Sequence, residues 1–248
     1  MPDSGPETRL GDVHRFYALM ENLEERTGGK RVLATADGRV GWPERGVYFY
    51  FEPGEVRRTS GTGDRVVRVG THALRERAGT TLWGRLSTHK GPLAGMYPNG
   101  GNHRASIFRG HVGSALIARD SWPPAVCGNW CQGSQAPASV RRAEHPLEKA
   151  VSIHIREMPF LVLAVEDPPG PVSARACIEA NSIALLSNYG KLERIDTSSE
   201  LWLGRHSPRP EIQESGLWNV RHVDATYDPG FLDVLQSHIA STCRIGTH

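Results

Sequence analysis

The sequence predicts a mixed α/β domain of the α+β type, with a small, mainly antiparallel central sheet flanked by helices. Two runs rich in Val, Tyr and Phe, at 46–51 and 65–70, are separated by a polar loop with several glycines, which is typical of a β-hairpin. An amphipathic segment at 82–90 follows the hairpin and favours a helix. The continuous apolar run at 160–165 indicates a further strand, buried on both faces.

Helices are expected on both sides of the hairpin. Between residues 10 and 27 apolar side chains recur at spacings of three and four, and Gly28 ends the pattern. After the hairpin a helix begins near Thr81, whose hydroxyl can cap it. On that helix Arg85 and His89 lie four residues apart, so their side chains share one face.

The remaining chain alternates between helical patterns and irregular stretches. Helices are predicted for the second half of 101–120, for 145–157, from about 173 onward, and after Pro229. The stretch 121–143, rich in Pro, Gly, Ser and Gln, is predicted to be irregular. Most of the chain beyond Lys191 is expected to be irregular as well.

Composition favours a soluble, cytoplasmic protein. The net charge is +2, so any nucleic-acid footprint must come from clustered charge rather than from the total. The N-terminal residues show no apolar run typical of a secretory signal, and the run at 160–165 is far shorter than the roughly 20 residues of a membrane span. Four cysteines are too few and too scattered for a disulfide scaffold.

Three short motifs follow one another between residues 46 and 89: Gly46-Val47-Tyr48, Arg68-Val69-Gly70 and Arg85-x-x-x-His89. In this order they resemble the GIY-YIG nuclease family, which has Gly-Ile-Tyr on the first strand and Tyr-Ile-Gly on the second. A helix with a catalytic Arg then follows in that family. The resemblance departs at the second motif, where Arg stands in place of the leading Tyr.

Glu179 lies in an otherwise apolar stripe of the helix predicted from about 173. A carboxylate in such a stripe is costly unless it is paired or bound to a cation. One interpretation is an ion pair with Arg175, although Arg N-terminal to Glu is the weaker order at this spacing. The other, which we favour, is the metal-binding Glu that the resemblance implies on a helix after an apolar strand, with Asn188 as the Asn that follows it.

The resemblance implies a role for each motif residue in phosphodiester hydrolysis. Glu179 would hold Mg²⁺ or Mn²⁺, a hard cation that often uses only one or two carboxylates and keeps several waters. Arg85 would stabilise the negative charge on the scissile phosphate. Tyr48 would take the proton from the attacking water or orient it, and His89, where the family carries Tyr or His, would share hydrogen bonds with Tyr48 or the phosphate.

Further substrate contacts are expected from residues around these motifs. Because Arg68 stands where the family has Tyr, the hydroxyl of that Tyr is missing here. His72 is a candidate to provide the lost hydrogen bond. Arg104 and Arg109 are the best candidates for phosphate contacts outside the motifs, with a solvated helix face as the alternative. Asn188 is expected to fix local geometry or to touch a phosphate.

The resemblance also suggests how the chain is divided. Arg85 and Glu179 are farther apart than in small family members, so we predict an insertion at about 91–158 within a core spanning 46–190. Residues 1–45 are predicted to form an N-terminal helical arm, and 191–248 a C-terminal extension that packs on the core.

These observations predict a metal-dependent endonuclease that hydrolyses DNA phosphodiester bonds. One alternative is a non-catalytic nucleic-acid-binding protein on the same scaffold. The other is a structural or interaction module in which Cys127 and Cys131 bind zinc, although only one cysteine pair is present where about four ligands are needed.

Overall fold

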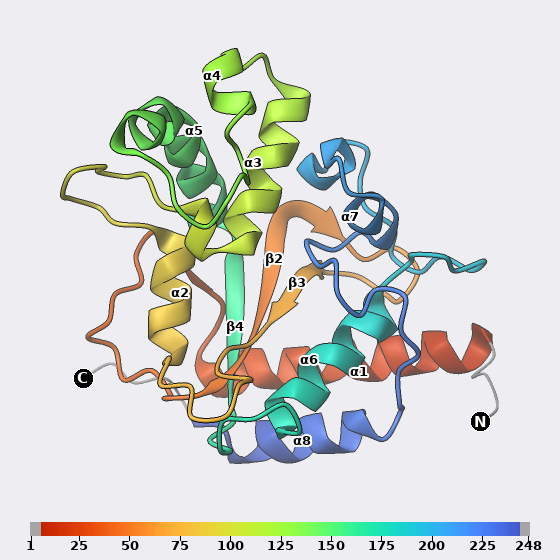
Figure 1. The fold of residues 1–248 in the computed structure, drawn as a ribbon. Coiled ribbons are helices and arrows are strands. Elements are labelled where there is room, and N and C mark those ends of the chain that lie inside the picture. The colour runs from red at the N-terminus through yellow and green to blue at the C-terminus, as the bar shows by residue number, and fades with distance from the viewer. Residues whose placement is uncertain (1–5, 244–248) are drawn as a thin grey trace.

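The computed structural model describes residues 6–243, apart from the side chains of residues 6 and 7. Its helices and strands, shown in Figure 1, are α1 (Pro6–Thr27), β1 (Arg31–Val32), β2 (Gly46–Val56), β3 (Asp64–Gly70), α2 (Leu82–Lys90), η1 (His103–Ala105), α3 (Ile107–Arg119), α4 (Pro124–Cys127), α5 (Ala138–Glu157), β4 (Pro159–Ala164), α6 (Ala174–Leu186), η2 (Leu203–His206), α7 (Pro210–Ser215) and α8 (Phe231–Ser241). Within residues 6–243, no helix is both long and apolar enough to cross a lipid bilayer.

The sheet is small and entirely antiparallel, in the strand order β1-β4-β2-β3. The hairpin predicted from the sequence is formed by β2 and β3, and the apolar run at 160–165 supplies β4 on the other side of β2. Tyr48 therefore lies between Gly70 on β3 and Val162 on β4. The predicted α+β fold with a small antiparallel sheet flanked by helices is confirmed.

Alternate residues of β2 face two different cores, because successive side chains of a strand point to opposite faces. Val47 and Phe49 pack with α1, α6 and α8 on one face. Tyr48 and Tyr50 pack with α2, α3 and α5 on the other. The sheet is thus covered by helices on both sides (Figure 1). The two catalytic helices expected from the sequence, α2 and α6, belong to different layers.

One helix start in the predicted insertion was wrong, and one short helix there was not predicted. The helix expected from residue 145 begins at Ala138, and the short α4 lies in the stretch 121–143 that was predicted to be irregular. The first turns of α5 are largely exposed, so they carry no apolar period, and Pro146 inside the helix suggests a break. All four helical segments between 91 and 158 lie on the same side of the sheet as α2.

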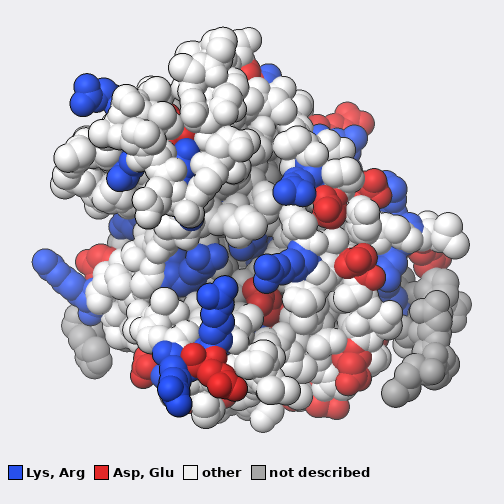
Figure 2. Space-filling model, in the orientation of Figure 1, with Lys and Arg blue, Asp and Glu red and all other residues white. Residues whose placement is uncertain are grey.

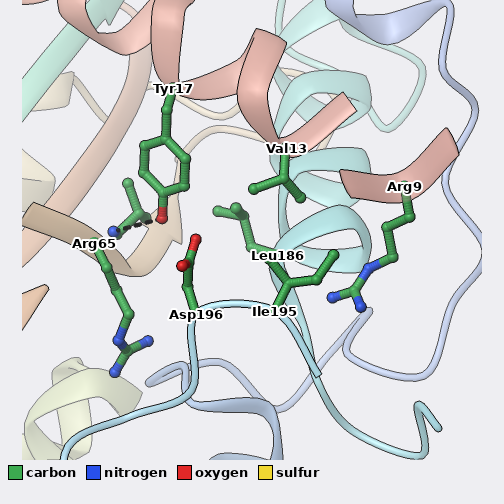
Figure 3. Close-up of a pocket in the computed structure, with 8 residues that line it drawn as sticks. Arg9, Val13, Tyr17, Arg65, Leu186, Ile195 and Asp196 are labelled. Atoms are coloured by element: carbon green, nitrogen blue, oxygen red, sulfur yellow. Dashed lines mark hydrogen bonds between the residues drawn. The ribbon is translucent and has the colours of Figure 1, made fainter. Parts of the chain in front are cut away.

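Both ends of the described chain pack against the sheet. Phe16 and Leu23 of α1 have no exposed surface and share a core with α8. Arg9 of α1 donates hydrogen bonds to the carbonyls of Leu185 and Ser187, at 3.0 and 2.7 Å. Figure 3 shows Arg9 and Asp196 lining a small pocket where α1 meets the segment after α6. The division of the chain at residues 45 and 190 stays a prediction, since contacts cross both positions.

β3 lies at the edge of the sheet, so the helices on the two faces can approach each other beside this strand. Because β3 is an edge strand, a side chain from α6 can reach past its end toward the opposite face. Trp218 and Asn219 cover part of this edge: the Trp218 N–H donates to the Val67 carbonyl at 2.7 Å, and the Asn219 amide pairs with Val69. The end of β3 at Gly70 stays next to α6.

Candidate active site at the edge of the sheet

A buried hydrogen-bonded chain links Tyr48 to α3. The Tyr48 hydroxyl lies 3.0 Å from His89 Nε2, and His89 Nδ1 lies 2.8 Å from the hydroxyl of Ser106, the N-cap of α3. Burial lowers the pKa of His89 well below its usual range, and Arg85 and Arg68 add to the effect. His89 is therefore neutral at pH 7, and with its proton on Nδ1 it accepts the Tyr48 O–H at Nε2.

The two motif glycines are required by close contacts around this chain. A Cβ on Gly70 would lie 2.4 Å from the Tyr48 hydroxyl oxygen, and a Cβ on Gly46 would lie 2.3 Å from the Leu163 carbonyl oxygen. Neither residue has a positive φ. Both glycines are thus explained by space: one admits the Tyr48 ring and the other admits the neighbouring strand.

Two arginines, Arg68 and Arg85, lie beside this chain and form what we call the edge pair. Arg68 donates to the Trp218 carbonyl at 2.6 Å and lies over the Phe108 ring, 4.5 Å from its centroid. Arg85 donates to the Ala105 carbonyl at 3.4 Å. The Nε atoms of both are buried, and neither has a hydrogen-bond partner within residues 6–243. Unpaired, buried guanidinium donors are suited to a phosphate oxygen.

Glu179 reaches the same place from α6. One of its carboxylate oxygens accepts the Thr71 N–H at 3.1 Å, just beyond the end of β3. Burial raises the pKa of Glu179, and Arg68 and the Thr71 N–H oppose that rise. Arg85 opposes it as well. The carboxylate lies just beyond the end of β3, the strand that carries Arg68, although α2 and α6 cover opposite faces of the sheet.

The alternative of an Arg175–Glu179 ion pair is wrong. The Arg175 guanidinium pairs with Asp167 and donates to the His72 carbonyl at 2.6 Å. Its charge is thereby used within the loop that precedes α6. Glu179 is left with the edge pair and Arg221 as its neighbouring cations.

The residues around Glu179 fit a Mg²⁺-type ion held by a single protein carboxylate. One oxygen of Glu179 is engaged by Thr71, and the other has no protein donor among the described residues. A hard divalent ion accepts one carboxylate oxygen and fills its other positions with water or substrate phosphate. No group of three or more His, Cys, Asp and Glu side chains is placed to hold a metal in the part of the chain that the structure describes, Cys127 and Cys131 included.

His72 has a ring nitrogen available for a substrate or water, whereas the Asn188 amide is already hydrogen-bonded within the protein. His72 lies beside the site: its Nδ1 donates to the Thr80 carbonyl at 2.8 Å, and its buried Nε2 has no partner in residues 6–243. Burial lowers its pKa, helped by Arg175, so Nε2 is an acceptor at pH 7. Asn188 is buried at the far end of α6, where its amide bonds the Ile195 N–H and carbonyl, both at 2.8 Å. These bonds favour the local geometric role over contact with a phosphate.

The expectation that Arg104 and Arg109 contact DNA is corrected by their pairing. Arg109 is fully buried and donates to the Glu148 carboxylate at 2.5 and 3.0 Å. Arg104 holds both oxygens of the Glu144 carboxylate, at 2.7 and 2.8 Å. We call these two arginines the interior pair. Their N–H groups are already used by carboxylates and carbonyls, which leaves them no role as a phosphate-binding surface.

Three contributors escaped the sequence argument. Ser106 holds His89, the Thr71 N–H holds Glu179, and Arg221 adds charge near the carboxylate. Ser106 precedes an apolar helix and is recognisable as an N-cap, but nothing in the sequence joins it to His89. In Figure 2, Lys and Arg side chains gather around a hollow near the centre of the face that is drawn.

A family model described as the GIY-YIG domain matches residues 7–245. The chain belongs to the GIY-YIG domain family. Comparison with curated proteins found no match, and comparison with solved structures found none either. GIY-YIG proteins are in general endonucleases that act on DNA and typically use divalent metal ions. Family membership therefore indicates nuclease activity in general, while the residues that perform it are argued below.

Proposed function

We propose that this GIY-YIG protein is a metal-dependent endonuclease that hydrolyses DNA phosphodiester bonds at the edge of β3. The observation that carries the proposal is the pair of buried, unpartnered Nε–H groups of Arg68 and Arg85 beside a carboxylate with one oxygen unused. Buried donors without partners are costly, so an anion that pairs with them is strongly favoured there. A phosphate would pair with these guanidiniums, and the free oxygen of Glu179 would hold a divalent cation beside it.

Each side chain has a distinct task in this proposal. Arg85 and Arg68 bind the non-bridging phosphate oxygens and stabilise the negative charge that increases in the transition state. A Mg²⁺ or Mn²⁺ ion on Glu179 would supply charge stabilisation at the leaving oxygen. Arg68 takes the place of the second motif's Tyr as a phosphate ligand, and the unpartnered His72 Nε2 is available to accept a hydrogen bond from a water.

Proton transfer is assigned to the Tyr48–His89 pair. Tyr48 Oη takes a proton from the attacking water while its own proton passes to His89 Nε2, and Ser106 holds the ring through Nδ1. A neutral His89 is required for this step, because a protonated ring has no acceptor at Nε2. Tyr48 has no exposed surface, so a side chain covering it must move when phosphate binds. Arg85, whose hydrogen bond to Ala105 is long at 3.4 Å, is the group least firmly held.

Incubation of supercoiled plasmid DNA with the protein and Mg²⁺ or Mn²⁺ tests the proposal. Wild type is expected to nick or linearise the plasmid, and Glu179→Ala and Arg85→Ala are expected to lose cleavage. The control variant Arg142→Ala, at an exposed position on α5, is expected to cleave as wild type does. Glu179→Ala is also expected to keep DNA binding. If wild type binds DNA but never cuts duplex, single-stranded or branched DNA with either ion, the non-catalytic binder replaces this proposal.

A further inference from the structure

A second hollow lies beside the candidate active site, between α3 and the residues that lead into α7. Its volume is about 390 Å³, within the range of roughly 300–1,000 Å³ that is usual for small-molecule sites. Side chains from three segments line it, including Ile107, His111 and Ser114 of α3, Cys131, and Pro208 and Arg209. Nothing in the motif argument or in the cleavage proposal uses this hollow.

The wall formed by α3 carries an unpaired imidazole. His111 is only 9% exposed, and its ring makes no hydrogen bond to any described residue, although it lines the hollow. Burial lowers the pKa of His111 to about 4, and Arg68 and Arg209 contribute to the shift. At pH 7 the ring is neutral, with one N–H donor and one acceptor nitrogen. That combination matches a group that offers both acceptors and donors, such as the edge of a nucleobase.

Two further side chains give the hollow a charged end and an apolar end. Arg209 is exposed, and its guanidinium makes no hydrogen bond within residues 6–243, in contrast to Arg104, which lines the same hollow but is held by Glu144. Ile107 is 61% exposed and gives the rim of the hollow an apolar surface. An exposed, unpaired cation and an apolar surface are suited to the phosphate and the flat face of one nucleotide.

Arg68 connects this hollow with the candidate active site. Its guanidinium lies over the ring of Phe108, 4.5 Å from the centroid, on the same helix that carries Ile107 and His111. A chain of nucleotides whose phosphate sits on the edge pair therefore lies next to α3, which forms one wall of the hollow.

We propose that this hollow binds one nucleotide of the DNA strand next to the cleaved phosphodiester, with Arg209 on its phosphate and His111 and Ser114 on its base. This inference rests on the proposed function, since it assumes that a phosphate sits on the edge pair. It adds a specificity-determining subsite: His111 reads the base, and Ile107 lies against its face. Arg209 contributes affinity without sequence preference.

The test measures binding and cleavage separately. Binding of a fluorescently labelled duplex is followed by anisotropy without divalent metal, over a range of salt concentrations. Arg209→Ala is expected to weaken binding and to lower the slope of log affinity against log salt by about 1, while Arg209→Lys restores the slope. The matched control Arg142→Ala, at an exposed position on α5, is expected to leave both unchanged.

Cleavage of a duplex library randomised around one site tests the role of His111. His111→Ala is expected to flatten the base preference next to the cut while Ser114→Ala shifts it less, and melting curves check that both variants are folded. An unchanged salt slope in Arg209→Ala together with an unchanged base preference in His111→Ala overturns the subsite.

Failure of the subsite and failure of the cleavage proposal are distinguishable. If wild type never cuts, the proposed function fails, and the metal-free binding series still decides whether Arg209 and His111 contact DNA, with selection of bound sequences replacing the cleavage library. If wild type cuts and these variants bind and select as wild type does, the subsite alone is wrong.

Discussion

The edge pair, Arg68 and Arg85, and the interior pair, Arg104 and Arg109, show how differently the same residue type is used in one chain. Each interior arginine meets a buried carboxylate, Glu144 or Glu148, and is saturated with hydrogen bonds. Each edge arginine instead keeps a buried Nε–H without a partner. The partner, rather than the arginine, decides whether the guanidinium is structural or available to a substrate.

One arginine of the interior pair also supports the candidate active site. Arg109 donates to the His89 carbonyl at 2.8 Å, and its backbone N–H bonds the Ser106 hydroxyl that holds the His89 ring. Arg109 therefore positions the imidazole on which Tyr48 depends. We expect interior substitutions to affect stability first, and edge substitutions to affect chemistry first.

The largest expected effect is on folding, from Arg109→Ala. Removing the guanidinium leaves the Glu148 carboxylate buried with only His103 beside it, and breaking a buried ion pair costs about 3–5 kcal/mol. Urea unfolding, with Arg142→Ala as the control, measures the loss. A decrease of less than about 1 kcal/mol in the free energy of unfolding would mean that Arg109 is not structural, in contrast to what we infer for the interior pair.

The next effect is on cleavage, from Arg85→Ala. If Arg85 stabilises the transition state as proposed, the single-turnover rate falls by about 10²–10³. Its one hydrogen bond is 3.4 Å long, so the free energy of unfolding changes by less than about 1 kcal/mol. A variant that cuts normally but is strongly destabilised would place Arg85 with the interior pair.

Tyr48→Phe probes the hydroxyl that is hydrogen-bonded to His89. The substitution leaves His89 Nε2 buried without its partner, which costs about 1–3 kcal/mol of folding free energy. Cleavage is expected to fall by more than this loss explains, because the proposed proton acceptor is gone. Comparing the rate at a temperature where both proteins are fully folded separates the two effects. Equal rates there would remove Tyr48 from the chemistry.

The smallest effect is the pH dependence of stability set by Glu179. Because burial raises its pKa, the folded state favours the protonated form, and stability that is present below the unfolded-state pKa is lost as pH rises through the folded-state pKa. Without metal, Glu179→Gln is therefore expected to be slightly more stable than wild type at pH 7, and the gap closes in acid. Mg²⁺ should raise the melting temperature of wild type alone. A gap that widens in acid contradicts the assignment.

Local signals in the sequence predicted most of the elements. The hairpin, the helices capped by Thr81 and Ser173, and the buried strand β4 follow from alternation, periodicity and capping, which act over a few residues. The site motifs were also recognisable, since Tyr48, Arg85 and His89 lie on adjacent elements of the hairpin and its helix.

Long-range partners were outside the reach of such signals. Glu148 lies 39 positions after Arg109, and the sequence gives no sign that the two carry a buried ion pair. Glu179 accepts the N–H of Thr71, 108 positions away in the chain and just beyond the end of the edge strand β3. For this reason Arg104 and Arg109 were predicted to contact phosphates. The contacts of Ser106 with His89 and of Thr71 with Glu179 were not predicted.

A double-mutant comparison of single-turnover cleavage tests the central claim most directly. If Arg85 and Glu179 act on one phosphate, removing the second group after the first costs little more, since groups that act as a unit are strongly non-additive. The Arg85→Ala/Glu179→Gln protein should then cut about as slowly as the slower single variant. Losses that multiply would mean that the two residues act independently, and the proposed active site at the edge of β3 would be wrong.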